Sequence, residues 1–303
     1  MSVRRFNELR GEDVVYAVDR QERTFLPDAE HCPLCPTRPG GPATEIPFPS
    51  FEIAVFENRF PTFEAPEGAA EVVVYTDDHE GSFATLEPGR ARELMWVWRQ
   101  RYEELGGRED VAYVLIFENR GVEVGTTLHH PHGQIYAFPF LPPVAAAELA
   151  ADERLGGCAT CELLGRELRD RERVLRGEGE VVAYVPFAAR WPYETHVVVR
   201  EHRPSLLECS DSELDALAEV LQAVTRGFDR LFERSFPYVM VLHQAPCDGR
   251  GAGHLHVEFY PPLRSATKLK YPAGCEQGAG TFVMDVLPEA SAAALRSAID
   301  GTS

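Results

Sequence analysis

The sequence predicts an α+β protein that consists of two similar halves, which we expect to pack together as an internal pseudo-dimer. Each half contains, in the same order, a Cys-x-x-Cys pair, two strands, a histidine after the second strand, a helix, and a strand pair that carries a His-x-His motif. The spacings agree as well, because Cys35 precedes His79 by nearly the same interval as Cys161 precedes His202. Matching order and spacing together indicate an internal repeat.

In the first half, three stretches have the alternating or apolar pattern of strands, at residues 4–25, 51–56 and 71–76. A helix follows, with Pro88 in its first turn, where the missing backbone N–H leaves no helical hydrogen bond unmade. The apolar side chains of this helix recur at helical spacing, at Leu94, Val97, Trp98, Tyr102 and Leu105.

The last strand pair of the first half carries the most unusual residues of the chain. An apolar run over residues 111–117 breaks at Glu118-Asn119-Arg120-Gly121, as expected of a buried strand that enters a turn. The next extended run has His130, His132 and Gln134 at alternate positions, so these side chains would lie on one face of a sheet. Two imidazoles and an amide are costly to bury without partners, so we favour a functional site over histidines satisfied within a core.

The second half repeats these elements. We place the halves at residues 1–145 and 146–303, with a polar linker over 142–157. Strands are predicted over 181–185, 196–199 and 238–242, and the last strand pair ends in His254-Leu-His256. Ser210 and Glu213 form a capping box, which opens a helix with apolar residues at Leu214, Leu217, Leu221, Val224 and Phe228.

Length and composition exclude several classes of protein. A chain of 303 residues with 44% hydrophobic and 26% charged residues is typical of a globular protein with a large core. There is no apolar run of membrane-spanning length and no signal-like start, so we expect a cytoplasmic protein without a membrane partner. The net charge of −18 argues against a nucleic-acid partner, which would require a basic surface. Seven cysteines in a cytoplasmic chain favour metal ligands or thiols over disulfides.

The segment His130-Pro-His132-Gly-Gln134, with Phe117-Glu-Asn-Arg-Gly121 before it, resembles the active-site signature of the galactose-1-phosphate uridylyltransferase family. That family belongs to the histidine-triad superfamily of nucleotide transferases and hydrolases, and the resemblance covers nearly the whole chain. It implies two histidine-triad-like halves, each a mainly antiparallel sheet with packed helices. The activity it implies is the exchange of UMP between UDP-glucose and galactose 1-phosphate, through a uridylyl-histidine intermediate.

The first half has the ligand content of a tetrahedral zinc site, because a Cys-x-x-Cys pair precedes two distant histidines. The four residues are Cys32, Cys35, His79 and His130. Four protein ligands close the zinc shell, so this metal should be structural rather than catalytic. The alternative is a pair of reduced cysteines packed in a turn, and the family resemblance supports the zinc ligands.

By the repeat, the second half offers Cys158, Cys161, His202 and His254 as a second zinc site. Some members of the family lack this cysteine pair and bind a metal with a glutamate and three histidines. The matching residues here are Glu148, His243, His254 and His256. Because the cysteine pair is intact, we favour two zinc ions per chain.

His132 is the expected nucleophile, because a neutral imidazole whose other nitrogen is held by a hydrogen bond can attack phosphorus. Gln134 lies two residues further along the same face, and its amide would donate to a phosphate oxygen. A glutamine here resembles the transferase branch, since the hydrolases typically have a third histidine. In the second half His256 matches His132, but Glu258 replaces Gln134, so we expect that half to be structural.

The resemblance also implies which residues bind the substrates. Around the nucleotide, the matching positions are Asn58, Asn119, Gly125 and Thr127. Arg20 and Arg23 match arginines that the family lends to a neighbouring subunit, which implies a homodimer, although ordinary surface arginines remain the alternative. In the sugar-phosphate segment, Lys270 matches a phosphate ligand and Glu276 a ligand of hexose hydroxyls. Three residues depart from well-known members: Arg59 replaces an aspartate, Cys275 a tyrosine and Phe282 a glutamine.

These departures keep other activities open. The first is a transferase or phosphorylase with the same chemistry and another base, such as one that acts on ADP-glucose, and a panel of donors would separate the two. The second is a hydrolase of nucleotide conjugates, which would release nucleotide without an acceptor and which Gln134 disfavours. The third is a zinc-stabilised binding protein without activity, for which replacement of His132 would leave function intact.

Overall fold

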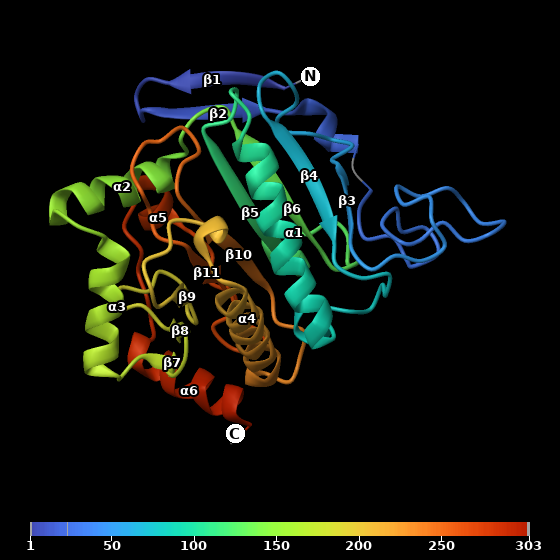
Figure 1. Ribbon diagram of the computed structural model, residues 1–303. Coiled ribbons are helices and arrows are strands. Elements are labelled where there is room, and N and C mark those ends of the chain that lie inside the picture. Colours follow the sequence, from blue (N-terminus) through green and yellow to red (C-terminus); the bar gives the residue numbers. More distant parts are fainter. Residues whose placement is uncertain (1, 23, 302–303) are drawn as a thin grey trace.

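The computed structural model describes residues 2–22 and 24–301. Its centre is a nine-stranded antiparallel sheet with the order β3-β4-β6-β5-β10-β11-β9-β8-β7 (Figure 1). In chain order the strands are β3 (Ala54–Glu57), β4 (Ala69–Val74), β5 (Tyr113–Arg120), β6 (His132–Phe138), β7 (Val174–Arg176), β8 (Val181–Tyr184), β9 (Thr195–Val199), β10 (Tyr238–His243) and β11 (His256–Tyr260).

The sheet is made of two halves that repeat the same strand order. From the outside inward, the first half runs β3-β4-β6-β5 and the second runs β8-β9-β11-β10, with β7 added at its edge. The halves join where β5 pairs with β10, with Ile116 opposite Leu242 and Arg120 opposite Tyr238. The predicted α+β class is confirmed, and the two sheets of the repeat form one continuous sheet.

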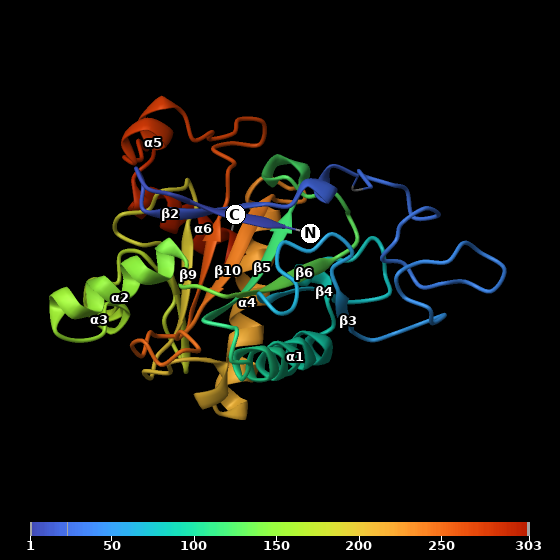
Figure 2. The ribbon, with the colours of Figure 1, turned by 90° about the horizontal axis from the view of Figure 1, so that it is seen from above.

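The two long helices α1 (Pro88–Gly106) and α4 (Asp211–Leu231) lie side by side over one face of this sheet (Figure 2). Pro88 begins α1 as predicted. In α4 the Ser210 hydroxyl accepts a hydrogen bond from the Glu213 amide at 3.2 Å, and the Glu213 carboxylate accepts one from the Ser210 amide at 2.7 Å. This reciprocal pair satisfies two amides of the helix start, as the capping box predicted.

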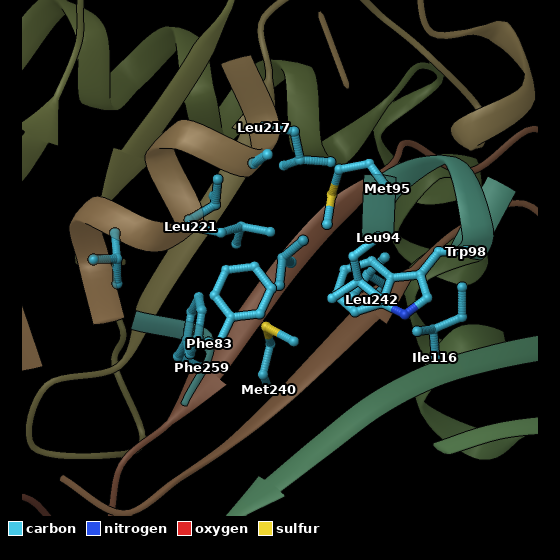
Figure 3. Close-up of a cluster of buried hydrophobic side chains, with 14 of the residues drawn as sticks. Phe83, Leu94, Met95, Trp98, Ile116, Leu217, Leu221, Met240, Leu242 and Phe259 are labelled. Carbon is cyan, nitrogen blue, oxygen red and sulfur yellow. The ribbon is translucent and has the colours of Figure 1, made fainter. Parts of the chain in front are cut away.

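The main core lies between these helices and the sheet. Figure 3 shows Leu94, Met95 and Trp98 of α1 facing side chains of α4, β10 and β11, among them Leu217, Leu221, Met240, Leu242 and Phe259. Trp98 has no exposed surface and stacks on Phe83 with 6.2 Å between ring centroids. Residues from both halves fill this core, so neither helix buries its apolar face within its own half alone.

The N-terminal strand predicted over residues 4–25 is wrong in extent. The chain instead forms a hairpin of β1 (Val3–Asn7) and β2 (Glu12–Tyr16), followed by the 3-10 helix η1 (Val18–Glu22). The Asn7 side chain accepts hydrogen bonds from the amides of Leu9 and Arg10, and Gly11 takes a positive φ of 67°. This asparagine turn reverses the chain in the middle of the alternating pattern, which by itself does not reveal the reversal.

The segment expected to form the polar linker, residues 142–157, is mostly helical, because it contains α2 (Pro143–Leu155). Alanine, leucine and glutamate are strong helix formers, and Pro143 stands in the first turn. The second helix of this region is α3 (Ala159–Asp170), and the remaining short helices are η2 (Phe83–Thr85), η3 (Val122–Val124), η4 (Leu206–Glu208), α5 (Gly274–Ala279) and α6 (Pro288–Asp300). None of the helices in the described part of the chain has both the length and the apolar character needed to cross a bilayer.

Candidate active site and metal clusters

The first Cys/His cluster lies where β4 ends and β6 begins. The ligand atoms of Cys32, Cys35, His79 and His130 all lie within 4.8 Å of one another. The Sγ atom of Cys35 is 3.4 Å from Nδ1 of both histidines, and the Sγ atom of Cys32 is 4.0 Å from Nδ1 of His130. Two ligands of a tetrahedral zinc lie roughly 3.3–3.8 Å apart, so these residues fit a closed shell of four.

His130 has the protonation state that a metal ligand needs. Burial lowers its pKa to about 4, so the ring is neutral at pH 7. Its Nε2 lies 2.7 Å from the Thr76 carbonyl oxygen, to which it donates, so the lone pair of Nδ1 faces the cysteines. Burial also raises the pKa of Cys35 to about 12, so a thiolate forms here only with a cation beside it.

The second Cys/His cluster repeats this arrangement with Cys158, Cys161, His202 and His254. Nδ1 of His254 lies 3.5 Å from Sγ of Cys158 and 3.3 Å from Sγ of Cys161, and Nδ1 of His202 lies 3.6 Å from Cys161. Nε2 of His254 lies 2.9 Å from the Val199 carbonyl oxygen, the counterpart of Thr76. Burial lowers the pKa of His254 to about 4, as it does for His130.

The alternative ligands of the second half form a separate group. Glu148, His243 and His256 lie within 4.8 Å of one another, without His254. The Glu148 carboxylate is 2.9 Å from Nδ1 of His243, and the His243 and His256 rings stack with 4.9 Å between centroids. Both nitrogens of His254 are already engaged with the cysteine cluster and Val199, so the structure does not assemble the four-residue alternative around it.

His132 begins β6, and the alternation of this strand sets its direction. Ile135 packs in the core under α1, so His132, Gln134 and Tyr136 lie on the opposite face of the sheet. Nδ1 of His132 lies 2.7 Å from the His130 carbonyl oxygen, to which it donates, and this fixes the tautomer in which Nε2 is the basic nitrogen. The His132 ring is therefore held in one orientation, and the same backbone segment also supplies a residue of the first cluster.

The Gln134 side chain is oriented by two donors. Its Oε1 accepts hydrogen bonds of 3.2 Å from the side-chain NH₂ group of Asn58 and from the Tyr136 hydroxyl. Oδ1 of Asn58 in turn accepts a hydrogen bond from the Phe60 backbone amide at 2.9 Å, and this bond orients the Asn58 side chain. With its oxygen engaged, Gln134 presents its NH₂ group as a donor beside His132.

A cavity on this face of the sheet combines apolar walls with polar groups. Leu34, Phe56, Phe60 and Val72 supply apolar walls, and Asn58, Thr127, His132 and Gln134 supply polar groups. Thr24, Glu45 and Arg59 are the other polar residues of the lining. The structure thus brings four of the expected site residues to one cavity: Asn58, Thr127, His132 and Gln134.

A second, larger cavity meets the first at His132 and Leu128, which line both. Its lining includes Asn119, Arg120, Arg234 and His129. Gly125 ends the turn η3 beside it with a φ of 84°, a left-handed conformation that a glycine adopts without strain. His132 therefore lies between a smaller and a larger cavity, each lined by both apolar and polar groups.

The other expected substrate ligands lie elsewhere. Nη1 of Arg20 donates to the Thr62 hydroxyl at 2.7 Å, and Arg23 lies outside the described residues. Lys270 is 98% buried and donates to Glu276 at 2.9 Å and to the Val283 carbonyl at 2.7 Å. This lysine, with backbone amides, lowers the pKa of Glu276 to about 2. Arg20, Lys270 and Glu276 do not belong to the described lining of the two cavities that meet at His132.

Sequence reasoning missed several residues of the site. Tyr136 shares the face of His132 and Gln134, so strand alternation alone was sufficient to find it. Glu45 lies in the irregular loop before β3, where no periodicity marks a side chain that faces a cavity. Phe56 and Phe60 flank Asn58 near the end of β3, where aromatic residues are common. Their identity therefore does not mark them as cavity residues.

The fold and the site define a protein of two repeated halves, each with a Cys/His cluster. In the first half, His132 donates a hydrogen bond to a backbone carbonyl and lines a cavity. Two family models match it, "Galactose-1-phosphate uridyl transferase, N-terminal domain" over residues 62–142 and "Galactose-1-phosphate uridyl transferase, C-terminal domain" over residues 145–301. The chain belongs to the galactose-1-phosphate uridylyltransferase family.

Similar proteins agree with this assignment. A Thermotoga maritima protein with that name is 38% identical, over 96% of this chain and 97% of its own length. A Streptomyces lividans protein with the same name is 37% identical, over 98% of this chain and 87% of its own length. Among solved structures, a uridylyltransferase superposes with a TM-score of 0.88 at 31% identity and covers all of both chains.

Proposed function

We propose that this protein exchanges UMP between UDP-glucose and galactose 1-phosphate by two displacements at His132. The observation that carries this proposal is the 2.7 Å hydrogen bond from Nδ1 of His132 to the His130 carbonyl, beside a cavity of nucleoside character. It leaves Nε2 as the nucleophile and fixes its direction. Membership of a family of uridylyltransferases supports the same reaction.

In the first displacement, Nε2 of His132 attacks the α-phosphorus of UDP-glucose. The bond to the bridging oxygen breaks, glucose 1-phosphate leaves with the electron pair, and UMP remains bonded to the histidine. In the second displacement, a phosphate oxygen of galactose 1-phosphate attacks the same phosphorus, and the P–N bond breaks to regenerate His132. Its position between two cavities suits a phosphorus with the nucleoside on one side and the leaving group on the other.

Gln134 acts on the non-bridging phosphate oxygens. Its NH₂ group, turned outward because Asn58 and Tyr136 engage its oxygen, donates where negative charge increases in the transition state. A neutral amide does this without the charge repulsion that a carboxylate would impose on a phosphate.

The two Cys/His clusters fit zinc and would hold it with Cys32, Cys35, His79 and His130, and with Cys158, Cys161, His202 and His254. With four protein ligands each, the ions would stabilise the fold and take no part in the phosphate chemistry. If the chain divides into halves at residues 1–145 and 146–303, each half contains one cluster. The first half also carries the reacting histidine.

A homodimer would complete the substrate site. Arg20 of η1 and the segment with Lys270 and Glu276 lie outside the described lining of the cavities at His132, as expected of groups that serve the site of a second copy. Lys270 would have to exchange its partner Glu276 for a substrate phosphate on dimer formation. Analytical ultracentrifugation tests the dimer.

Initial-rate kinetics test the proposed reaction. Varying UDP-glucose at several fixed concentrations of galactose 1-phosphate should give parallel double-reciprocal lines, because glucose 1-phosphate leaves before the acceptor binds. ADP-glucose in the same assay serves as the matched donor with another base. Converging lines would contradict the covalent route, and faster turnover of ADP-glucose would contradict the uridine assignment.

A further inference from the structure

One side chain of the nucleoside cavity has no role in the reaction as described. Glu45 is the carboxylate of the described cavity lining, whose other members are apolar, amide, hydroxyl, imidazole or cationic groups. A carboxylate in a site for a phosphorylated ligand repels the phosphates, so it must serve another part of the ligand. The question is which donors of a nucleotide it would meet.

Glu45 is held from two sides. Its backbone amide donates to the Pro33 carbonyl at 2.9 Å, within the Cys32–Cys35 knuckle of the first cluster. The next residue, Ile46, is 98% buried and its carbonyl accepts from the Thr37 amide at 3.0 Å, so the segment is joined to the knuckle at two points. Nη1 of Arg59 lies 3.4 Å from Oε1 of Glu45, which orients the carboxylate from the opposite wall. The carboxylate is therefore placed before any ligand binds.

The composition of the cavity limits what Glu45 can recognise. His132 and Gln134 mark its phosphate end, and Leu34, Phe56, Phe60 and Val72 provide the apolar surfaces that suit a base. Between a base and an α-phosphate lies the ribose, whose two vicinal hydroxyls are donors that a carboxylate accepts in pairs. Acidic side chains serve this purpose in other nucleotide-binding folds.

We propose that Glu45 accepts hydrogen bonds from the ribose hydroxyls and makes the site selective for ribonucleotides over 2′-deoxyribonucleotides. The inference rests on the proposed function, because it assumes a nucleotide in this cavity. Arg59 is a positioning residue that orients Glu45, and the knuckle of the first Cys/His cluster sets the position of its backbone. A structural cluster and a specificity-determining side chain thus share one loop.

Binding of UMP and 2′-deoxy-UMP, measured by calorimetry without any acceptor, tests the inference separately from the exchange reaction. The wild type should bind UMP about 10- to 100-fold more tightly than 2′-deoxy-UMP, the range expected for a hydrogen bond to a charged group. In Glu45→Ala this ratio should fall to about threefold or less, through weaker UMP binding alone. Glu45→Gln should give an intermediate ratio, and Arg59→Ala should reduce the ratio less than Glu45→Ala does.

Glu30→Ala is the matched control, because Glu30 is an exposed carboxylate just before the Cys32–Cys35 knuckle and lies outside the cavity lining. It should keep the wild-type ratio. Melting temperature and metal content, measured for every variant, show whether the loop remains folded. Equal loss of both ligands in a folded Glu45→Gln, no discrimination in the wild type, or no UMP binding at all would overturn the inference. Exchange assays report on the proposed function independently, since an enzyme can exchange UMP without discriminating at the ribose.

Discussion

The two halves of the molecule place the same groups in the same geometry, yet they differ at the residue that would face a phosphate. His132 and His256 each donate from Nδ1 to the carbonyl of the histidine two residues before, at 2.7 Å in both halves. In the first half the next residue on that face is Gln134, which is held by Asn58 beside an open cavity. In the second half it is Glu258, which is 93% buried.

The residues around Glu258 determine its charge. Burial opposes the ionised form of Glu258, but His196, His256 and His243 outweigh burial and lower its pKa well below the ordinary value. Arg190 and Tyr260 also contact this carboxylate. An anion at this position repels phosphate and accepts hydrogen bonds where a phosphate needs donors. Because His256 and Glu258 also line a cavity, a cavity alone does not distinguish the halves. The comparison therefore indicates that a fixed histidine is insufficient for phosphate chemistry, which also requires a neutral donor beside it.

The largest expected difference between the halves concerns the two corresponding histidines. His132→Ala should lower kcat for UMP exchange by about 10⁴-fold or more, because the nucleophile is lost. His256→Ala should keep kcat within about threefold of wild type and reduce the free energy of unfolding by roughly 1–3 kcal/mol. Exchange kinetics and chemical denaturation of both variants check this, and comparable loss of kcat in both would refute the assignment of roles.

Gln134→Glu gives the first half the carboxylate that the second half has at the corresponding position, Glu258. We expect kcat to fall by about 10²- to 10³-fold, because a donor to the phosphate is replaced by a repelling charge. Gln134→Ala, which removes the donor without adding charge, is the control and should be the more active of the two. Steady-state kinetics at pH 7 separate them, and the opposite order would show that charge at this position is unimportant.

Replacing a cysteine of either Cys/His cluster should lower the stability of the protein, but only replacement in the first cluster should also lower the rate of exchange. Cys32→Ser and Cys158→Ser should each lower the melting temperature by roughly 5–15 °C, as expected when a closed metal shell is broken. Cys32→Ser should in addition reduce exchange by about tenfold, because His130 of that cluster holds the His132 ring. Calorimetry and metal analysis provide the test, and wild-type protein of full stability without bound metal would contradict it.

Gly133 lies between His132 and Gln134, where the second half has the buried Val257. A Cβ atom at Gly133 would lie 2.3 Å from the Tyr75 hydroxyl and 3.0 Å from the Phe117 carbonyl. Gly133→Ala should therefore cost about 2–3 kcal/mol of stability and slow exchange. Adding Tyr75→Phe should recover part of both losses, since it removes the nearer atom. A double-mutant cycle measures this coupling, and strict additivity would exclude the predicted contact.

The smallest expected effect is a pH dependence that belongs to the second half. Because the pKa of Glu258 is lowered in the folded protein, its ionised form stabilises the fold above the ordinary value of 4.5. This contribution is lost as the pH falls toward the lowered pKa. Glu258→Gln should therefore be less stable than wild type at pH 7, by about 1–2 kcal/mol, with a smaller difference at pH 3. Unfolding free energies at both pH values check this, and an unchanged difference would contradict the ionised state.

The sequence predicts the repeated elements because they follow from local patterns. Helical spacing identifies α1 and α4, the capping box identifies the start of α4, and alternation places His130, His132 and Gln134 on one face. The hairpin at the N-terminus was missed because Asn7 and Gly11 reverse the chain within a continuous alternating pattern.

The cavity was only partly predictable for a different reason. Its lining combines the knuckle, the loop with Glu45, the end of β3 and the turn before β6, which are far apart in the chain. Periodicity describes one element at a time, so it does not reveal that Glu45 lines the same cavity as Asn58 and Gln134. The pairing of Lys270 with Glu276 is likewise a tertiary contact between two residues that were expected to bind substrate separately.

The most direct test of the central claim is intact mass spectrometry after mixing the protein with UDP-glucose in the absence of acceptor. The wild type and His256→Ala should gain the mass of one uridylyl group, peptide mapping should place it on His132, and His132→Ala should gain nothing. Galactose 1-phosphate added afterwards should remove the group. An adduct that persists in His132→Ala, or one that maps to the second half, would contradict the account.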